Sequence, residues 1–249
     1  MRRRRRITLI ALAGAAGAML LGASGCATWR LGEARVLARS SQPLQQQPSR
    51  PALRMVVAGD STAVGTGASA PQSSLAGLIA QDFPRLAIDN RARDGATLAD
   101  TAAQIERTPP TERFDLLLVM AGGNDVIRLR SEAALRADID RVLTLARQRA
   151  DHVVLMPAGN VGNAPFFPPP VAWAMTRRAR MLHAVVAELA PQRGAAYVNL
   201  FRERDDDPFV RERGLHAADG LHPSDAGYRA WYEALLAQTD LRQRLAAAR

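Results

Sequence analysis

The residues of this sequence best suited to chemistry are one serine and one aspartate–histidine pair. Ser61 stands three residues after the valine-rich apolar run Leu53–Ala58, and Asp219 stands three residues before His222. A serine hydroxyl is a poor nucleophile at neutral pH and needs an adjacent base, which a histidine can supply. A carboxylate can orient that imidazole and stabilise its charged form. These residue types predict nucleophilic acyl transfer if the fold brings them together.

Ser61 and Asn124 have a second interpretation as helix caps. Serine and asparagine after a strand commonly accept hydrogen bonds from the first N–H groups of the next helix. From its own stretch alone, Ser61 fits capping as well as it fits catalysis. The side-chain amide of Asn124 can instead donate to the negative charge that an acyl-transfer transition state builds on the carbonyl oxygen. We interpret the neighbouring Asp60 and Asp125 as acceptors that fix their loops.

The sequence gives less support to a metal-binding role for His222 or to a catalytic role for the other histidines. An Asp-x-x-His pair can ligate a metal, but the sequence has only 4 histidines and no companion ligand cluster, so we expect no metal. His216 is an alternative base, although Arg213 occupies the position three residues before it. We expect His152, which begins a strand, and His183, which lies within a helix, to be structural.

Apolar runs alternate with segments of helical periodicity from Leu53 onward. The predicted strands are Leu53–Ala58, Arg85–Asn90, Phe114–Met120, His152–Met156 and Ala196–Leu200. The predicted helices are Ser74–Phe83, Leu98–Glu106, Glu132–Arg149, about Val171 to Leu189, and one from Ser224 or Asp225 to about Gln238. This alternation predicts one domain, residues 53–249, with a parallel sheet covered by helices on both faces. Residues that follow the strands are expected at one edge of that sheet, where ligands bind.

Four short blocks carry a family resemblance. They are Gly59-Asp60-Ser61, Gly95, Gly122-Gly123-Asn124-Asp125 and Asp219-Gly220-Leu221-His222. With these blocks in this order, the chain from Leu53 to about Gln238 resembles the SGNH (GDSL-like) hydrolase superfamily. The resemblance implies an α/β fold: a single-domain, flavodoxin-like three-layer α/β/α sandwich with a five-stranded parallel sheet.

The resemblance assigns a role to each block. It implies that Ser61 is the nucleophile and that Asp219 and His222 complete a catalytic triad. It also implies an oxyanion hole made of the backbone N–H groups of Ser61 and Gly95 and the side chain of Asn124. A glycine at 95 would let the chain approach closely, with no Cβ in the way. The implied activity is that of a serine esterase or acyl hydrolase, which cleaves a carboxylic ester or thioester without a cofactor.

Two other functions are compatible with the same blocks. An O-acyltransferase or O-acetyl-modifying enzyme of the cell envelope would use the same residues, with a sugar hydroxyl in place of water. A lipid-anchored binding protein could have kept the fold and lost the chemistry, although the intact set of site residues argues against this.

The irregular segment 157–170 is the expected wall of a substrate pocket. Asn160, Phe166 and Phe167 are its candidate substrate contacts, and an apolar wall would suit an acyl chain. The alternative is that the two phenylalanines only pin a proline-rich loop to the domain. The expected substrate is a small-molecule, lipid or glycan ester, such as a lysophospholipid or an O-acetylated glycan.

The N-terminus is typical of an exported protein. Residues 1–26 combine five arginines, an apolar run and small residues ending at Cys26, which predicts a signal peptide. This resembles the signal of bacterial lipoproteins, whose cysteine is lipidated, although Ala23 stands where that family usually has leucine. An ordinary cleaved signal or an uncleaved anchor are the alternatives. Residues 27–52, rich in Gln, Pro and Ser, are predicted to be a flexible tether. We therefore expect a periplasmic or membrane-anchored lipoprotein in a bacterial envelope.

Composition excludes several function classes. All 33 basic residues are arginine, so a lysine-dependent phosphate loop and Schiff-base chemistry are excluded. The net charge is +9, of which Arg2 to Arg6 supply 5, and 9 − 5 leaves +4 for the remainder. With no sustained basic run and only 5% aromatic residues, nucleic acid is not expected as a partner.

Overall fold

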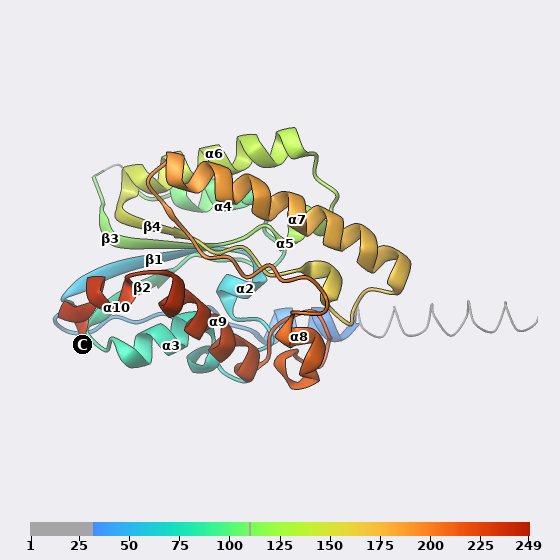
Figure 1. Ribbon diagram of the computed structural model, residues 1–249. Helices are drawn as coiled ribbons and strands as arrows, with labels where there is room; N and C mark the ends of the chain where they lie inside the picture. The colour runs from blue at the N-terminus through green and yellow to red at the C-terminus, as the bar shows by residue number, and fades with distance from the viewer. Residues whose placement is uncertain (1–31, 110) are drawn as a thin grey trace, which may run out of the picture.

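The computed structural model describes residues 32–109 and 111–249 (Figure 1). Among these residues the centre is one sheet of five parallel strands in the order β2-β1-β3-β4-β5. The strands are β1 (Leu53–Gly59), β2 (Leu86–Asn90), β3 (Phe114–Met120), β4 (Ala150–Leu155) and β5 (Ala196–Tyr197). This is the flavodoxin-like order, in which the strand order reverses between β1 and β3. The predicted sheet is confirmed.

Helices cover both faces of the sheet. They are α2 (Ser61–Val64), α3 (Leu75–Asp82), α4 (Leu98–Glu106), α5 (Gly123–Ile127), α6 (Glu132–Arg149), α7 (Pro169–Gln192), α8 (Pro208–Arg211), α9 (Asp225–Gln238) and α10 (Leu241–Arg244). Figure 1 shows α4, α6 and α7 on one face and α3, α9 and α10 on the other. The predicted three-layer α/β/α sandwich is therefore confirmed.

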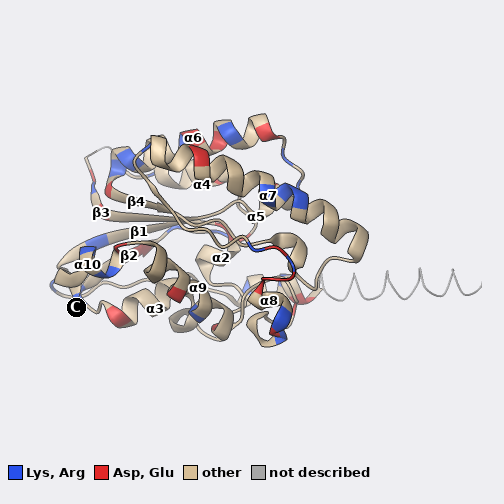
Figure 2. Ribbon diagram, viewed as in Figure 1, with Lys and Arg blue, Asp and Glu red and all other residues tan. Residues whose placement is uncertain are grey.

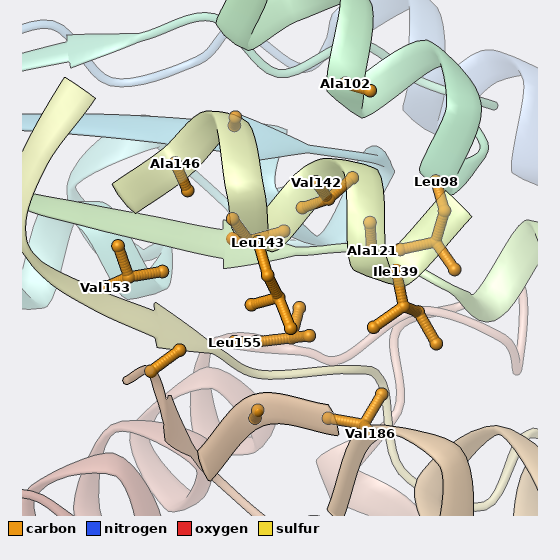
Figure 3. Close-up of a cluster of buried hydrophobic side chains, with 14 of the residues drawn as sticks. Leu98, Ala102, Ala121, Ile139, Val142, Leu143, Ala146, Val153, Leu155 and Val186 are labelled. Carbon is orange, nitrogen blue, oxygen red and sulfur yellow. The ribbon is translucent and has the colours of Figure 1, made fainter. Parts of the chain in front are cut away.

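The strands are apolar over most of their length because both faces of the sheet are covered. In β3, Leu117 and Val119 pack in the cluster under α4, α6 and α7. Leu116, Leu118 and Met120 alternate with them and pack in the cluster under α3 and α9. Figure 3 shows the first cluster, where side chains of α4, α6 and α7 meet those of β4. A strand buried on both faces accordingly appears in the sequence as a continuous apolar run.

Most predicted boundaries agree with the structure, and two differences have a local cause. α7 begins at Pro169 rather than Val171, because proline is well tolerated in the first helical turn. β5 ends at Tyr197 rather than Leu200. The last hydrogen bond from this segment to β4 comes from the N–H of Val198, which donates to the carbonyl oxygen of Leu155 at 3.0 Å. The next N–H, that of Asn199, donates to Gln238 Oε1 at 2.8 Å.

The described part of the predicted tether packs on the domain. Residues 32–40 are helical, and Leu44 is buried in the core. Gln46 pairs with Ile88 on the open edge of β2, through backbone hydrogen bonds of 3.1 and 2.8 Å. The prediction of a flexible tether is wrong for this part. Its composition is typical of a tether, but the unpaired edge of β2 offers backbone groups for pairing, and the side-chain amides of Gln45 and Gln46 add hydrogen bonds to the same edge.

The hydrophobic core lies entirely within the C-terminal nine-tenths of the chain. Both apolar clusters are built from residues between Leu44 and Ala248, so a chain of residues 27–249 contains the whole of this core. The predicted signal, residues 1–26 with Cys26, lies outside the described residues. None of the described helices is long and apolar enough to cross a membrane.

Candidate active site

Ser61 stands at the sharp turn that follows β1. Gly59 ends the strand with φ +148°, and a Cβ there would lie 1.9 Å from the carbonyl oxygen of Met120, so only glycine fits. Asp60 then caps α2, its Oδ1 accepting from the N–H and the hydroxyl of Thr62 at 2.9 and 2.7 Å. Because Asp60 is the cap, Ser61 is the first helical residue and its side chain does not serve as the cap.

The structure brings Ser61 together with His222 and Asp219, 158 residues or more further along the chain. Ser61 Oγ lies 2.9 Å from His222 Nε2. His222 Nδ1 lies 2.5 Å from Asp219 Oδ2. The carboxylate can only accept, so Nδ1 carries the proton, and Nε2 of the neutral ring is left as an acceptor for the serine hydroxyl. This is the geometry of a serine activated by a base that is itself oriented by an acid.

Asp219 is held in one orientation. Its side chain is fully buried, and its Oδ1 accepts from the N–H groups of Leu221 and His222 at 2.9 and 3.0 Å. Burial alone would raise the pKa of Asp219, but the hydrogen bond from the His222 ring and these backbone bonds outweigh it. The net effect is a pKa below the ordinary value. The group therefore stays ionised at neutral pH and remains an acceptor for the Nδ1 proton of His222.

Gly95 lies on a loop that two hydrogen bonds join to α5, the helix that contains Asn124. Asn124 follows β3 at the start of α5, which is capped by Gly122, so Asn124 is not the cap. One N–H of its side-chain amide donates to the carbonyl oxygen of Ala96, at 3.1 Å. The guanidinium of Arg128 donates to the carbonyl oxygen of Gly95, at 2.8 Å. These two contacts fix the turn that carries Gly95.

The backbone at Gly95 adds a reason for glycine at this position. Gly95 has φ +74°, and a Cβ there would meet only the Arg128 guanidinium among the described residues, at 3.9 Å. Crowding by the protein itself therefore does not require glycine. The left-handed backbone, which residues other than glycine adopt only at a cost, favours it.

The buried carboxyl groups of Asp60 and Asp125 hold the loops at the strand ends. Neither forms a hydrogen bond with the Ser61 side chain. Burial raises the pKa of Asp60, against the opposing effect of its bonds from Thr62. Asp125 Oδ2 accepts from the N–H of Leu98 at 3.0 Å, and burial raises the pKa of Asp125 to about 6. Its Oδ1 has no hydrogen-bond partner among the described residues. Both carboxyl groups act as loop-fixing acceptors.

Ser61, Gly95, Asn124 and His222 line one cavity of about 270 Å³. It lies at the carboxyl edge of the sheet between β1 and β3, where the strand order reverses, which is where open α/β sheets bind ligands. Of the predicted substrate contacts, Asn160 lines the cavity. It is buried, and its amide donates to the carbonyl oxygen of Arg202 at 3.1 Å.

Phe166 and Phe167 are not among the residues that line this cavity. The N–H of Phe166 donates to the carbonyl oxygen of Gly220 at 3.0 Å, and Phe167 packs against the core. Their contacts are those of the alternative interpretation, in which they pin the loop beside the turn that carries Asp219.

Sequence reasoning missed much of the cavity wall. The side chains it overlooked come from the helix 32–40, α5, the segment before and within α8, and α9: Ala38, Ile127, Asp207, Phe209, Trp231 and Ala234. On α9 such residues have the helical spacing of ordinary core positions, so the sequence holds no signal for them. The aromatic pair Phe209 and Trp231, with ring centroids 6.0 Å apart, makes this part of the wall apolar.

The remaining histidines do not bond to Ser61. His216 lines the cavity, but its ring packs edge-on against Phe209. His183 is buried between the Tyr197 hydroxyl and the Ala158 carbonyl oxygen, at 2.6 and 2.8 Å, and burial lowers the pKa of His183 to about 4. His152 accepts from Arg244 at the opposite edge of the sheet. Within residues 32–109 and 111–249, no cluster of three or more His, Cys, Asp or Glu side chains could hold a metal.

Comparisons with known proteins bear on the family and the fold of this chain. The model of the GDSL-like Lipase/Acylhydrolase family matches residues 57–230, and no curated protein matches the sequence. The crystal structure of TesA is similar, with 22% identity and a TM-score of 0.60 over 76% of this chain and 98% of TesA.

Two Streptomyces enzymes have similar structures. The extracellular lipase from Streptomyces rimosus has 20% identity and a TM-score of 0.55, over 75% of this chain and 100% of the lipase. Phospholipase A1 from Streptomyces albidoflavus has 20% identity and a TM-score of 0.55, over 75% of this chain and 99% of that enzyme. At such identities the similarity establishes a shared fold.

Proposed function

Because the chain belongs to the GDSL-like lipase/acylhydrolase family and is an ester-hydrolysing enzyme, we propose that it cleaves its substrate through an acyl intermediate on Ser61. The family match confirms the SGNH (GDSL-like) resemblance drawn from the four sequence blocks. The observation that carries the mechanism is the hydrogen-bonded series from Asp219 through His222 to Ser61, at the cavity that Gly95 and Asn124 also line.

Acylation begins with proton transfer from Ser61 Oγ to His222 Nε2. Oγ attacks the carbonyl carbon of the ester, and the carbonyl oxygen takes up negative charge. Three donors are available for this oxygen: the N–H groups of Ser61 and Gly95 and the second N–H of the Asn124 amide. The N–H of Ser61 has no acceptor within α2, because it belongs to the first turn. Collapse breaks the bond to the alcohol, which leaves with the proton from His222.

Deacylation repeats these steps with water. His222 Nε2 takes a proton from a water molecule, whose oxygen attacks the acyl carbon. The same donors stabilise the second oxyanion, and collapse returns the proton to Ser61 Oγ and releases the carboxylic acid. Asp219 holds the imidazole in the required tautomer throughout. The proposed route uses only groups of this chain and water.

We also propose that the enzyme acts outside the cytoplasm, attached to a membrane of a bacterial envelope through a lipid on Cys26. The support is the sequence of residues 1–26, with its basic start, apolar run and small residues before the cysteine. In that location the ester belongs to a lipid, a glycan or a small molecule of the envelope.

A panel of p-nitrophenyl esters from acetate to palmitate tests the proposed function on residues 27–249. We expect hydrolysis that disappears in Ser61→Ala and is unaffected by Ser69→Ala, a matched control whose hydroxyl donates to Asp225 and not to His222. Equal turnover by Ser61→Ala would contradict the mechanism. Product analysis with and without a sugar acceptor separates hydrolysis, which we expect, from transfer to the sugar.

A further inference from the structure

The exposed apolar side chains of this protein are concentrated around the cavity. Among the described residues, the large apolar side chains that are exposed are Val36, Ile127, Leu129, Val171 and Trp173. Trp173 is the most exposed of them, at 68%. Together these five residues are called the apolar rim below. Single exposed apolar residues are ordinary, but a group of them on one side of a protein indicates a contact surface.

Each part of the apolar rim adjoins the cavity wall. Ile127 lines the cavity itself, and Val36 belongs to the helix 32–40, whose Ala38 lines it. The start of α7 packs on the short turn Val161–Asn163, another part of the wall. A Cβ on Gly162 of that turn would lie 2.3 Å from the carbonyl oxygen of Ala172.

The segment after α5 is fastened to the same helix. The guanidinium of Arg178 on α7 donates to the carbonyl oxygen of Arg130, at 2.9 Å. This contact places Leu129 beside the first half of α7. In Figure 1, the start of α7 and the blue start of the described chain both lie at the end of the sheet where the strands terminate. The apolar rim and the mouth of the cavity therefore belong to one face.

Unpaired positive charge accompanies the apolar rim. Four exposed arginines lie on the same segments: Arg35, Arg39, Arg128 and Arg177. Within residues 32–109 and 111–249, none of them forms an ion pair. Arg177 follows Trp173 by four residues, so the two share one side of α7, and the first half of α7 has no acidic residue (Figure 2). Glu33 is the acid on the helix 32–40, and Asp125 on α5 is buried.

The preceding stretch of chain limits how far this face can lie from a membrane. Cys26 stands six residues before Gly32, where the described helix begins. Six residues span at most about 20 Å when fully extended. A lipid on Cys26 would therefore keep the helix 32–40, and with it the mouth of the cavity, close to the bilayer. Because the segment 41–52 is docked on the domain, it does not act as a long tether that would let the domain reorient relative to the membrane.

We propose that the face bearing the apolar rim docks on an anionic lipid bilayer, so that the ester reaches Ser61 from the membrane. Tryptophan and aliphatic side chains enter the interfacial region, where an indole ring is favoured, and the unpaired arginines meet lipid phosphates. The substrate is then the acyl ester of a membrane lipid, with its acyl chain against the apolar wall near Phe209 and Trp231. This substrate assignment rests on the proposed esterase function, whereas the docking does not.

Vesicle flotation tests the docking without the anchor. Residues 27–249, not lipidated, are mixed with vesicles of equimolar phosphatidylcholine and phosphatidylglycerol. We expect the wild type to float with the vesicles and the double variant Trp173→Ser/Leu129→Ser to lose on the order of tenfold in binding. Trp173→Leu, which keeps an apolar side chain, should retain most of it.

A pair of arginine variants isolates the charge contribution. Arg177→Gln should weaken binding to these vesicles and leave weak binding to pure phosphatidylcholine vesicles unchanged. The matched control is Arg85→Gln. Arg85 is exposed, forms no ion pair with any residue that the structure describes, and lies just before β2, at the opposite edge of the sheet. It should bind like the wild type.

Activity readouts separate docking from catalysis. The Trp173→Ser/Leu129→Ser variant should hydrolyse soluble p-nitrophenyl acetate like the wild type, and hydrolyse a vesicle-embedded phospholipid on the order of tenfold more slowly. Flotation that is unchanged in this variant would overturn the docking. So would a wild type that does not float but forms a dimer dependent on Trp173, since the face would then join two copies of the chain. Binding that depends on Trp173, without turnover of any ester, would support the docking and refute the esterase mechanism.

Discussion

Replacing Asp219 by asparagine should inactivate the enzyme by reversing a single hydrogen bond. Asp219 Oδ1 already accepts from two backbone N–H groups, those of Leu221 and His222. The oxygen of an asparagine would keep these bonds, so its NH2 group would occupy the place of Oδ2. That group donates, and His222 Nδ1 would have to give up its proton in order to accept.

The expected magnitude follows from the change of tautomer. With Nδ1 as the acceptor, the proton moves to Nε2, 2.9 Å from Ser61 Oγ, and the ring can no longer accept the serine proton. In serine hydrolase triads the same exchange lowers kcat on the order of 10⁴-fold, equivalent to about 5.5 kcal/mol in the activation barrier. The side chain is nearly isosteric, so the thermal midpoint of unfolding should change little.

Steady-state hydrolysis of p-nitrophenyl acetate, measured on residues 27–249 with a thermal melt of each variant, gives both readouts. Asp225→Asn is the matched control. Asp225 also accepts from a backbone N–H and a side chain, those of Ser69, but it has no bond to His222. A kcat of Asp219→Asn within tenfold of the wild type, in a variant that melts normally, would refute this account of the site.

Three further predictions concern the loops around Ser61. Asn124→Ala should lower kcat/KM on the order of 10²–10³-fold with little change in KM, because it removes an oxyanion donor; an unchanged rate would show that the amide only holds Ala96. Gly95→Ala should lower the free energy of unfolding by about 1–2 kcal/mol in urea titrations, since φ +74° disfavours residues other than glycine, and no steric clash adds to this; a neutral effect would contradict it. The raised pKa of Asp125, about 6, means that the folded state binds a proton more tightly than the unfolded state. Stability from this group is thus highest below about pH 4 and falls as the pH rises through 6, by at most about 3 kcal/mol. Asp125→Asn should remove that decline; an identical pH profile in the variant would refute the assignment.

The sheet and its helices could be predicted because their sequences carry a simple signal. β3 is a near-continuous apolar run with the predicted bounds, and α4 and α6 show one apolar face of helical period. The short helices α2 and α5 were not predicted. Each has only one turn, which is too short for any periodicity. They matter for the site because they hold Ser61 and Asn124 at helix starts.

What the sequence could not supply depends on tertiary contacts. The docking of Gln46 on β2 depends on an open strand edge that only the folded sheet reveals. Likewise, Phe209 and Trp231 form part of the cavity wall. In the sequence they cannot be distinguished from ordinary residues of the hydrophobic core. Ser61, Asp219 and His222 could be proposed as a triad because their residue types and their order in the sequence match the family blocks. The left-handed turn at Gly95, by contrast, has no sequence marker beyond the glycine itself.

Identification of the residue that a fluorophosphonate modifies tests the central claim most directly. The reagent phosphonylates an activated serine, and trypsin should release the adduct in the peptide Met55–Arg85. The account predicts one adduct per chain, which fragmentation of the peptide locates at Ser61. Esterase activity should fall in proportion to labelling. Asp219→Asn should be labelled more slowly than the wild type. Stoichiometric inactivation with the adduct on any other residue, or full activity after Ser61 is labelled, would contradict it.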